Sequence, residues 1–194
     1  MHESPDTSSS GTLRAVVAVP LAEEYCRLIE ELEPRVQVIR DSSLTPPMRW
    51  PADWSGDPDF TRTAEQQAAF AALIDSADVL FGIPDVDAGH LARTVAANPN
   101  LRWVMTTAAG GGSTIQTAHL ASEDLGRVLF STTAGVHAGP LAEFAVFGVL
   151  AGAKDLPRLH ADKAARSWPD RWEMRQVDAM TVLVVGLGGI GAEC

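Results

Sequence analysis

The sequence predicts an α/β fold in which helices cover both faces of a parallel β-sheet. From residue 13 onward, short apolar runs rich in β-branched residues alternate with segments that repeat apolar side chains at helical spacing. Such alternation is typical of strand–helix–strand units, whose parallel strands are buried on both faces. In addition, an apolar run at 181–185 leads directly into the pattern G-x-G-x-x-G, which is typical of a strand that ends in a phosphate-binding turn.

The elements before residue 134 follow this alternation. The first predicted strand, 13–19, is an apolar run that ends at Pro20, and residues 21–32 form an amphipathic helix with Glu and Arg on its outer face. Thr63 and Gln66 form a capping box that begins an alanine-rich helix, which runs to about residue 75. The remaining predicted elements are strands at 36–39, 79–81, 101–106 and 128–130, and a helix at 91–97.

Residues 41–61 are rich in Pro, Asp and Trp, and we interpret them as a long irregular loop. Loops of this length inside a compact domain are usually functional or mobile. Trp50 and Trp54 either line a substrate cleft or anchor the loop, and the sequence leaves both interpretations open.

The character of the chain changes after Thr133. Pro140 is predicted at the first position of a helix, with Glu143 in its first turn. The body of this helix, 141–153, is apolar nearly all round, so we expect it to be buried between layers, domains or subunits. The helix stops at 154–157, and 159–176 is predicted to be a surface connection to a final strand at 182–185.

Composition limits the class of protein. The chain has 194 residues, 46% of them apolar, which is enough for one ordinary globular domain and part of a second. A net charge of -10 argues against a nucleic-acid or anionic-membrane partner, and no run is apolar enough to span a membrane. The polar segment 1–12 is predicted to be a disordered tail. Cys26 and Cys194 give no disulfide framework and predict a cytoplasmic protein.

Each glycine of the fingerprint has its own predicted role. Gly186 permits the tight turn, Gly188 lets the backbone approach a pyrophosphate, and Gly191 lets the following helix pack closely on the strand. The alternative is an ordinary glycine-rich turn. The acidic residue that would bind the ribose is expected about 20 residues further on, beyond the sequence, so NAD and NADP stay open.

Small residues at 106–114 follow the predicted strand 101–106, at the edge where open α/β sheets bind ligands. Consecutive small residues expose backbone N–H groups, which suit an anion such as a carboxylate. The alternative is a flexible turn without a ligand.

Other candidate residues are assigned no chemistry. His137 lies just before the apolar helix, and we interpret it as a surface or hinge histidine. Cys26 falls within an amphipathic helix and is predicted to be a packing residue. No catalytic Ser/His/Asp or Cys/His arrangement and no metal-ligand spacing stands out, so neither catalytic nor metal-binding residues are predicted.

Three motifs together resemble the D-isomer-specific 2-hydroxyacid dehydrogenases. They are 100–110 (NLRWVMTTAAG), 135–137 (GVH) with 142–144 (AEF), and 184–191 (VVGLGGIG), and the likeness runs from about Asp78 to Glu193. The resemblance implies a flavodoxin-like substrate-binding domain at 13–133. Residues 134–194 would be the interdomain helix and first strand of a Rossmann domain, inserted into the first, that binds NAD or NADP.

The resemblance also implies site residues. The backbone amides of Ala109 and Gly110 would hold the carboxylate of a small 2-oxo or 2-hydroxy acid. Gly186, Gly188 and Gly191 match the fingerprint, and Gly189 and Ile190 are expected against the pyrophosphate. The helix after Pro140 matches one that helps to build the homodimer interface of the family.

Two departures from the family pattern shape the expected function. Family members often carry aspartate where Gly112 stands, and their catalytic arginine, glutamate and histidine lie after the fingerprint, so none is assigned here. We therefore expect an incomplete NAD(P)-dependent dehydrogenase that is inactive alone, with exposed edges at 182–185 that promote aggregation. The alternatives are a non-catalytic module that binds a small carboxylate or a partner, and another two-domain NAD enzyme such as a formate or alanine dehydrogenase.

Overall fold

The computed structural model describes residues 11–194 and divides the chain into two compact units, Met1–Thr133 and Ala134–Cys194. Most of the predicted tail, 1–12, lies outside the described residues. Within the described residues, no helix is both long and apolar enough to cross a membrane.

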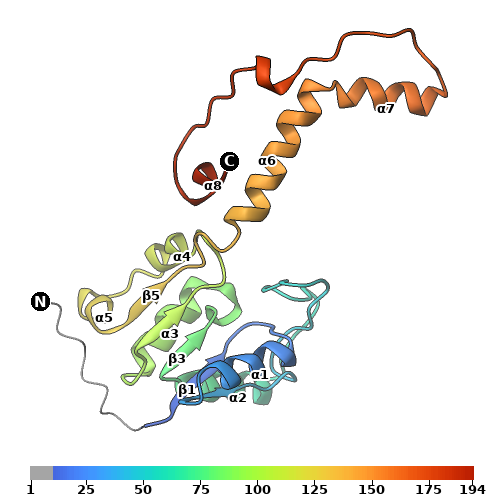
Figure 1. Ribbon diagram of the computed structural model, residues 1–194. Helices are drawn as coiled ribbons and strands as arrows, with labels where there is room; N and C mark the ends of the chain where they lie inside the picture. Colours follow the sequence, from blue (N-terminus) through green and yellow to red (C-terminus); the bar gives the residue numbers. More distant parts are fainter. Residues whose placement is uncertain (1–10) are drawn as a thin grey trace, which may run out of the picture. The chain divides into compact units, whose positions relative to one another are not determined.

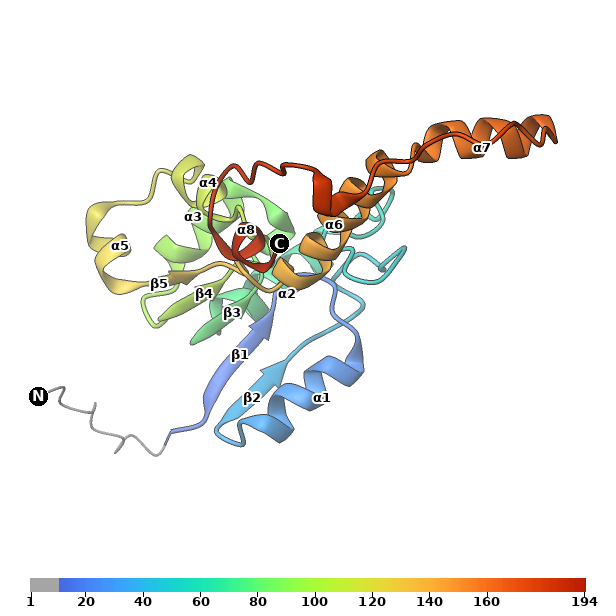
Figure 2. The same cartoon turned by 45° about the horizontal axis from the view of Figure 1, so that its top comes forward.

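The first unit is built on a five-stranded sheet in the order β2-β1-β3-β4-β5, and every neighbouring pair is parallel (Figure 1; all five strands are labelled in Figure 2). Because all five strands run the same way, their carboxyl ends meet at one edge of the sheet. The predicted parallel α/β sheet is therefore confirmed. The strands are β1 (Leu13–Val17), β2 (Val36–Ile39), β3 (Val79–Phe81), β4 (Trp103–Met105) and β5 (Leu129–Ser131).

Helices cover both faces of this sheet, as Figure 2 shows from a second side. Helix α1 (Glu23–Leu32) packs on one face, where buried Cys26 contacts Val17 and Val38. Helices α2 (Ala64–Asp75), α3 (Ala88–Ala97) and α4 (Gly112–Thr117) cover the other face. The larger core lies there, with fully buried Val16, Leu80 and Val104 from the strands and Ile74 and Leu91 from the helices. Cys26 is thus a packing residue, and burial raises the pKa of its thiol.

Local signals explain where these helices begin. The capping box of α2 is complete, since the Thr63 side chain accepts from the Gln66 N–H and the Gln66 side chain accepts from the Thr63 N–H. Asp87 caps α3 by accepting from the His90 N–H, so α3 begins three residues before the predicted 91–97. Helices α4 and α5 (Ser122–Arg127) were not predicted, because six residues are too few to show a helical period.

The second unit consists of helices α6 (Ala138–Ala153), α7 (Leu156–Ala165) and α8 (Gly189–Glu193), with a 3-10 turn, η2 (Val177–Ala179), between α7 and α8. Helix α6 begins two residues before Pro140, which is tolerated because the first turn needs no intrahelical donor. The predicted surface connection 159–176 was wrong in part, since α7 occupies its first residues and begins at Leu156 beside Pro157.

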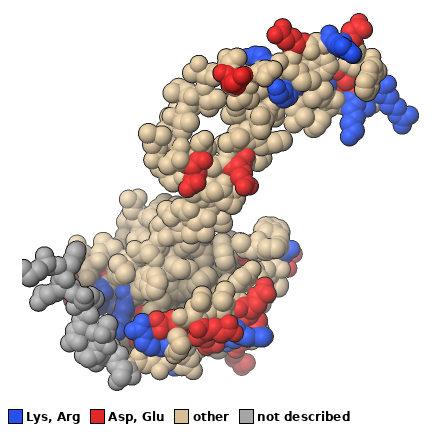
Figure 3. All heavy atoms as spheres, viewed as in Figure 1, with Lys and Arg blue, Asp and Glu red and all other residues tan. Residues whose placement is uncertain are grey.

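The expected burial of α6 is not seen within the chain. Its side chains Phe144 and Phe147 are 71% and 54% exposed, and only Ala142 and Ala153 are buried. The part of the surface that carries α6 bears few charged groups in the space-filling view (Figure 3).

The predicted strand at 182–185 was wrong. These residues have no regular secondary structure, and no strand among the described residues pairs with them. A strand exists only through hydrogen bonds to a neighbour, so an apolar β-branched run without one stays irregular. Leu183 and Val185 are accordingly 83% and 90% exposed.

Candidate functional site

The turn that follows β4 lies at the carboxyl edge of the sheet. Thr106 is buried directly after the strand, and its N–H donates to the Ser131 carbonyl of β5 at 2.8 Å. The next residues leave the core, so that Ala108, Ala109 and Gly110 are exposed before helix α4 begins at Gly112. The predicted small-residue turn is therefore anchored at one end and open to solvent in the middle.

Two carbonyl groups of this turn are hydrogen-bonded, whereas the three amides in its middle have no protein partner. The Ala108 carbonyl accepts from the Thr106 hydroxyl at 3.0 Å and from the Gly111 N–H at 3.2 Å, and the Thr107 carbonyl accepts from the Thr133 hydroxyl at 3.1 Å. Among residues 11–194, no protein group accepts a hydrogen bond from the N–H of Ala108, Ala109 or Gly110. Consecutive unpaired amides form a concave site of positive partial charge, which suits a carboxylate.

Gly111 is the residue that lets the turn close on the strand. A Cβ at this position would lie 2.1 Å from Thr106 Oγ1, whereas a Cβ at Gly110 or Gly112 would meet no atom within 4 Å. The position where family members often carry aspartate, Gly112, is thus open and unconstrained by packing.

The loop between β2 and α2 lies at the same edge and is held internally by an ion pair. The Arg49 guanidinium donates to both carboxylate oxygens of Asp53, at 2.7 and 3.0 Å, and the Gly56 N–H also donates to this buried side chain. The side-chain hydrogen bonds from Arg49 hold the pKa of Asp53 at about 2, so the pair is charged at neutral pH.

The two tryptophans of this loop differ in environment. The Trp54 ring packs on Phe81 of β3, with ring centroids 6.0 Å apart, so Trp54 anchors the loop. Trp50 is 56% exposed, and the Arg49 guanidinium lies 4.1 Å from its ring centroid. The structure therefore supports anchoring for Trp54 and leaves Trp50 free to line a cleft.

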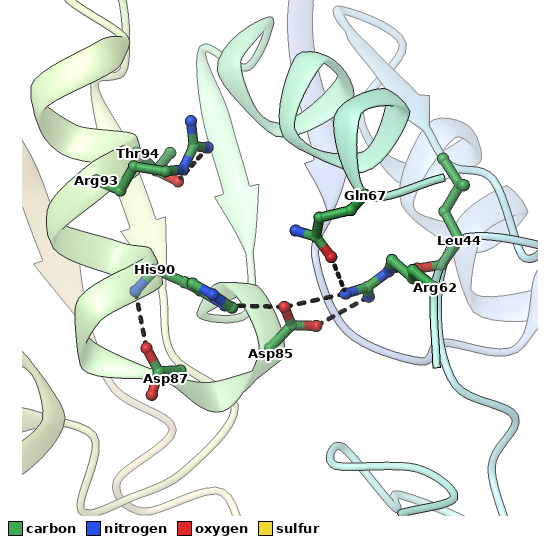
Figure 4. Close-up of polar contacts among 8 residues, drawn as sticks. All are labelled: Leu44, Arg62, Gln67, Asp85, Asp87, His90, Arg93 and Thr94. Atoms are coloured by element: carbon green, nitrogen blue, oxygen red, sulfur yellow. Dashed lines mark hydrogen bonds and ion pairs between the residues drawn. The ribbon is translucent and has the colours of Figure 1, made fainter. Parts of the chain in front are cut away.

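The end of the loop is fixed to the turn after β3 (Figure 4). Arg62 donates to both carboxylate oxygens of Asp85, at 2.8 and 3.1 Å, and to the Leu44 carbonyl. His90 Nδ1 lies 2.9 Å from the same Asp85 carboxylate. Asp85 has a φ of 54°, a left-handed conformation that these contacts hold in place. Acidic and basic groups lie close together on the visible face of the first unit (Figure 3).

A cavity of about 650 Å³ lies over the carboxyl ends of β1 and β2 and is lined by Val19, Leu21, Arg40 and Thr45. Its cation is already paired, because the Arg40 guanidinium forms hydrogen bonds with the Glu23 carboxylate and the Val38 carbonyl. The side-chain hydrogen bonds from Arg40 and Arg27 hold the pKa of Glu23 at about 2. The guanidinium in this cavity is therefore less available to a bound anion than the unpaired amides of the turn after β4.

The glycine-rich loop of the second unit contains one left-handed glycine and one close backbone approach. Gly186 has a φ of 98°, and a Cβ at Gly191 would lie 2.0 Å from the Gly186 carbonyl oxygen. A Cβ at Gly188 would meet nothing within 4 Å, which leaves this backbone open to a ligand. Gly189 and Ile190 form the first residues of α8.

His137 precedes α6, is exposed, and makes no side-chain capping bond to the helix. No group of three or more His, Cys, Asp or Glu side chains suited to a metal ion occurs in the described part of the chain. Sequence reasoning missed the two hydroxyls of Thr106 and Thr133, which have no pattern of their own and are recognised only from the carbonyls they contact.

No protein-family model matches the chain, and no curated protein matches it. Several solved structures, in contrast, match the chain. A D-isomer specific 2-hydroxyacid dehydrogenase family protein from Aeromonas salmonicida is 19% identical with a TM-score of 0.63, over 94% of this chain and 49% of that one. The chain shares its fold with the D-isomer-specific 2-hydroxyacid dehydrogenases.

Two further structures agree. The D-isomer specific 2-hydroxyacid dehydrogenase from Xanthobacter autotrophicus Py2, a complex with NADPH and MES, is 21% identical with a TM-score of 0.56, over 94% of this chain and 49% of that one. The 2-hydroxyacid dehydrogenase from Ketogulonicigenium vulgare Y25 is 14% identical with a TM-score of 0.51, over 94% of this chain and 50% of that one. The chain therefore spans about half the length of these dehydrogenases, and the predicted resemblance is confirmed for the fold.

Proposed function

We propose that this chain supplies the substrate-binding unit, and the beginning of the cofactor-binding unit, of an NAD(P)-dependent oxidoreductase. The reaction would interconvert D-2-hydroxy acids and 2-oxo acids. The observation that carries the proposal is the turn after β4, which presents unpaired amides at the carboxyl edge of a sheet with the dehydrogenase fold. Open α/β sheets bind ligands at this edge.

The amides of Ala109 and Gly110 would bind the substrate through its carboxylate. A carboxylate oxygen accepts strongly from N–H groups, and the exposed backbone of both residues leaves room for the anion. Because the carboxylate is attached to C2, holding it would also fix the position of the C2 oxygen and of the carbon that exchanges hydride.

The glycine-rich loop would hold the pyrophosphate of NAD or NADP. The left-handed Gly186, the open backbone at Gly188 and the close approach of Gly191 to Gly186 fit such a group, with Gly189 and Ile190 beside it. When bound, the nicotinamide would supply or accept the hydride at C2.

We expect these 194 residues to show no turnover alone. The resemblance places the arginine, glutamate and histidine that polarise the carbonyl and transfer the proton after the fingerprint, so the chain would bind and orient substrate only. A second candidate function follows from the same turn: the first unit has its own core and unpaired amides at its sheet edge, as a non-catalytic module that binds a carboxylate would.

An NMR titration of the chain with pyruvate tests the proposed site. We expect pyruvate to shift the amide resonances of Ala109 and Gly110 in a saturable way, while those of Gly188 and Gly191 respond to NADH or NADPH. Absence of any pyruvate-dependent shift at these amides would contradict the carboxylate site.

A steady-state assay separates the two candidate functions. NADH or NADPH with glyoxylate or hydroxypyruvate should give no turnover above background. Binding of pyruvate without any response to either cofactor would favour the binding module, and turnover would show that proton-transfer groups lie within these residues.

We further propose a homodimer for the complete protein, with α6 at the interface, because the apolar side chains of this helix are exposed. The free thiols of Cys26 and Cys194 support a cytoplasmic location.

A further inference from the structure

We propose that the hydroxyls of Thr106 and Thr133 are positioning groups that set the directions of the Ala109 and Ala108 amides in the turn proposed to bind the carboxylate. This inference rests on the proposed function, since it explains how the turn after β4 is set for an anion. Each hydroxyl donates to one carbonyl of the turn, Thr106 to Ala108 and Thr133 to Thr107.

Peptide geometry connects these carbonyls to the amides. A trans peptide group is planar, and its C=O and N–H point in opposite directions. All peptide bonds in the described chain are trans. The Ala108 carbonyl points to the buried Thr106 side chain, so the Ala109 N–H of the same peptide group must point away from it. By the same geometry, the Thr107 carbonyl on Thr133 directs the Ala108 N–H away from Thr133.

The two hydroxyls are well placed because each stands just past the carboxyl end of a strand. Thr106 directly follows β4, and its N–H is bonded to Ser131, the last residue of β5. Thr133 follows β5 by two residues and reaches back to the turn at 3.1 Å. The sheet thus holds both donors, and an exposed loop gains amides in a defined direction before any ligand arrives.

The fold does not depend on the Thr106 hydroxyl. The Ala108 carbonyl also accepts from the Gly111 N–H, so it keeps a partner when the hydroxyl is removed. Thr106→Val keeps the β-branched shape that fits beside Gly111. The loss should therefore appear as a wider range of peptide orientations and weaker anion binding rather than as unfolding.

The experiment compares Thr106→Val and Thr133→Val with Thr106→Ser, which keeps the hydroxyl. Thr117→Val is the matched control, because its hydroxyl also donates to a carbonyl, that of Ser113, but within α4. Affinity for pyruvate is read by NMR titration of the full chain, and the directions of the Ala108, Ala109 and Gly110 N–H bonds are read from residual dipolar couplings without ligand.

Removing one hydroxyl should weaken pyruvate binding by about three- to tenfold, the range expected for one hydrogen bond. Thr106→Val should change the residual dipolar coupling of the Ala109 N–H, and Thr133→Val should change that of the Ala108 N–H. Thr106→Ser and Thr117→Val should match the wild type in both affinity and couplings. Unchanged affinity with unchanged couplings in both valine variants would overturn the proposal.

The two proposals fail in different ways. If the wild-type chain does not bind pyruvate, the proposed function fails, and the couplings alone decide on positioning: altered Ala109 or Ala108 couplings support it and unaltered ones overturn it. If Thr106→Val does not fold, Thr133→Val gives the same two readouts for the second hydroxyl.

Discussion

Gly111 shows how a single residue decides the shape of the site. It is buried, its φ of -56° is ordinary, and any residue could adopt its backbone conformation. The need for glycine comes only from the neighbouring Thr106, whose Oγ1 would lie 2.1 Å from a Cβ. Gly112, one residue later, meets no atom within 4 Å, so the two glycines form a natural pair for comparison.

We predict that Gly111→Ala destabilises the chain by about 1–3 kcal/mol, because an overpacked contact forces Thr106 or the turn to move. Gly112→Ala lies at the first position of α4 and should be neutral or stabilising by about 0.4–1 kcal/mol, since alanine restricts the unfolded chain without a clash. Urea unfolding followed by circular dichroism measures both variants. Equal urea midpoints for the two variants would contradict the close contact between position 111 and Thr106.

The sequence predicted this turn but not its internal roles. Small residues after a strand indicated an anion site at 106–114, and the resemblance indicated Ala109 and Gly110. Gly110, Gly111 and Gly112 look alike in the sequence, and only the contact with Thr106 separates them. Long-range contacts of this kind are set by the fold, so no local pattern contains them.

At the scale of elements, local signals predicted those that carry their own pattern. Strands β2 and β3 have the predicted bounds, and α2 begins at the predicted capping box. The predictions failed where a local pattern is absent or incomplete. Helix α7 is polar and weakly periodic, and the apolar run at 182–185 lacks the neighbouring strand that would make it a strand.

Helix α6 presents the strongest mismatch between composition and exposure. Leu141, Phe144, Phe147 and Leu150 are all more than two-fifths exposed, although such side chains are normally removed from water. An apolar helix surface of this kind marks an interaction site. In the proposed homodimer, a second copy of the chain would cover this surface of α6.

We predict that the chain self-associates through α6 and that Phe144→Ser with Phe147→Ser weakens the association about tenfold or more, since buried aromatic side chains dominate interfaces. Leu32→Ser is the matched control, because Leu32 of α1 is 76% exposed and apolar but lies in the first unit. Sedimentation velocity over a range of concentrations gives the dissociation constants. A monomeric wild type, or equal weakening by Leu32→Ser, would contradict the role of α6.

At the scale of the whole molecule, the two units differ in how they are stabilised. The first unit contains the buried clusters on both faces of the sheet, in which Val16, Leu80 and Val104 are fully buried. In the second unit, the fully or nearly fully buried apolar side chains are those of Ala142 and Ala153. Since burial of apolar surface is the main stabilising term, stability should be concentrated in residues 13–133.

Amide hydrogen exchange of the full chain, resolved by peptide, tests this distribution. The amides of β1, β3 and β4 are paired within the sheet and should exchange only through unfolding of the whole first unit. In the described chain, the amides of 181–187 donate to no protein acceptor, so they should exchange at nearly the rate of a free peptide.

The double variant Phe144→Ser with Phe147→Ser separates the effect of self-association from the fold of one chain. If 181–187 is protected in the wild type and loses protection in this variant, self-association rather than the fold of one chain orders the segment. Protection at 181–187 equal to that of β3 in both proteins would contradict the unequal distribution of stability.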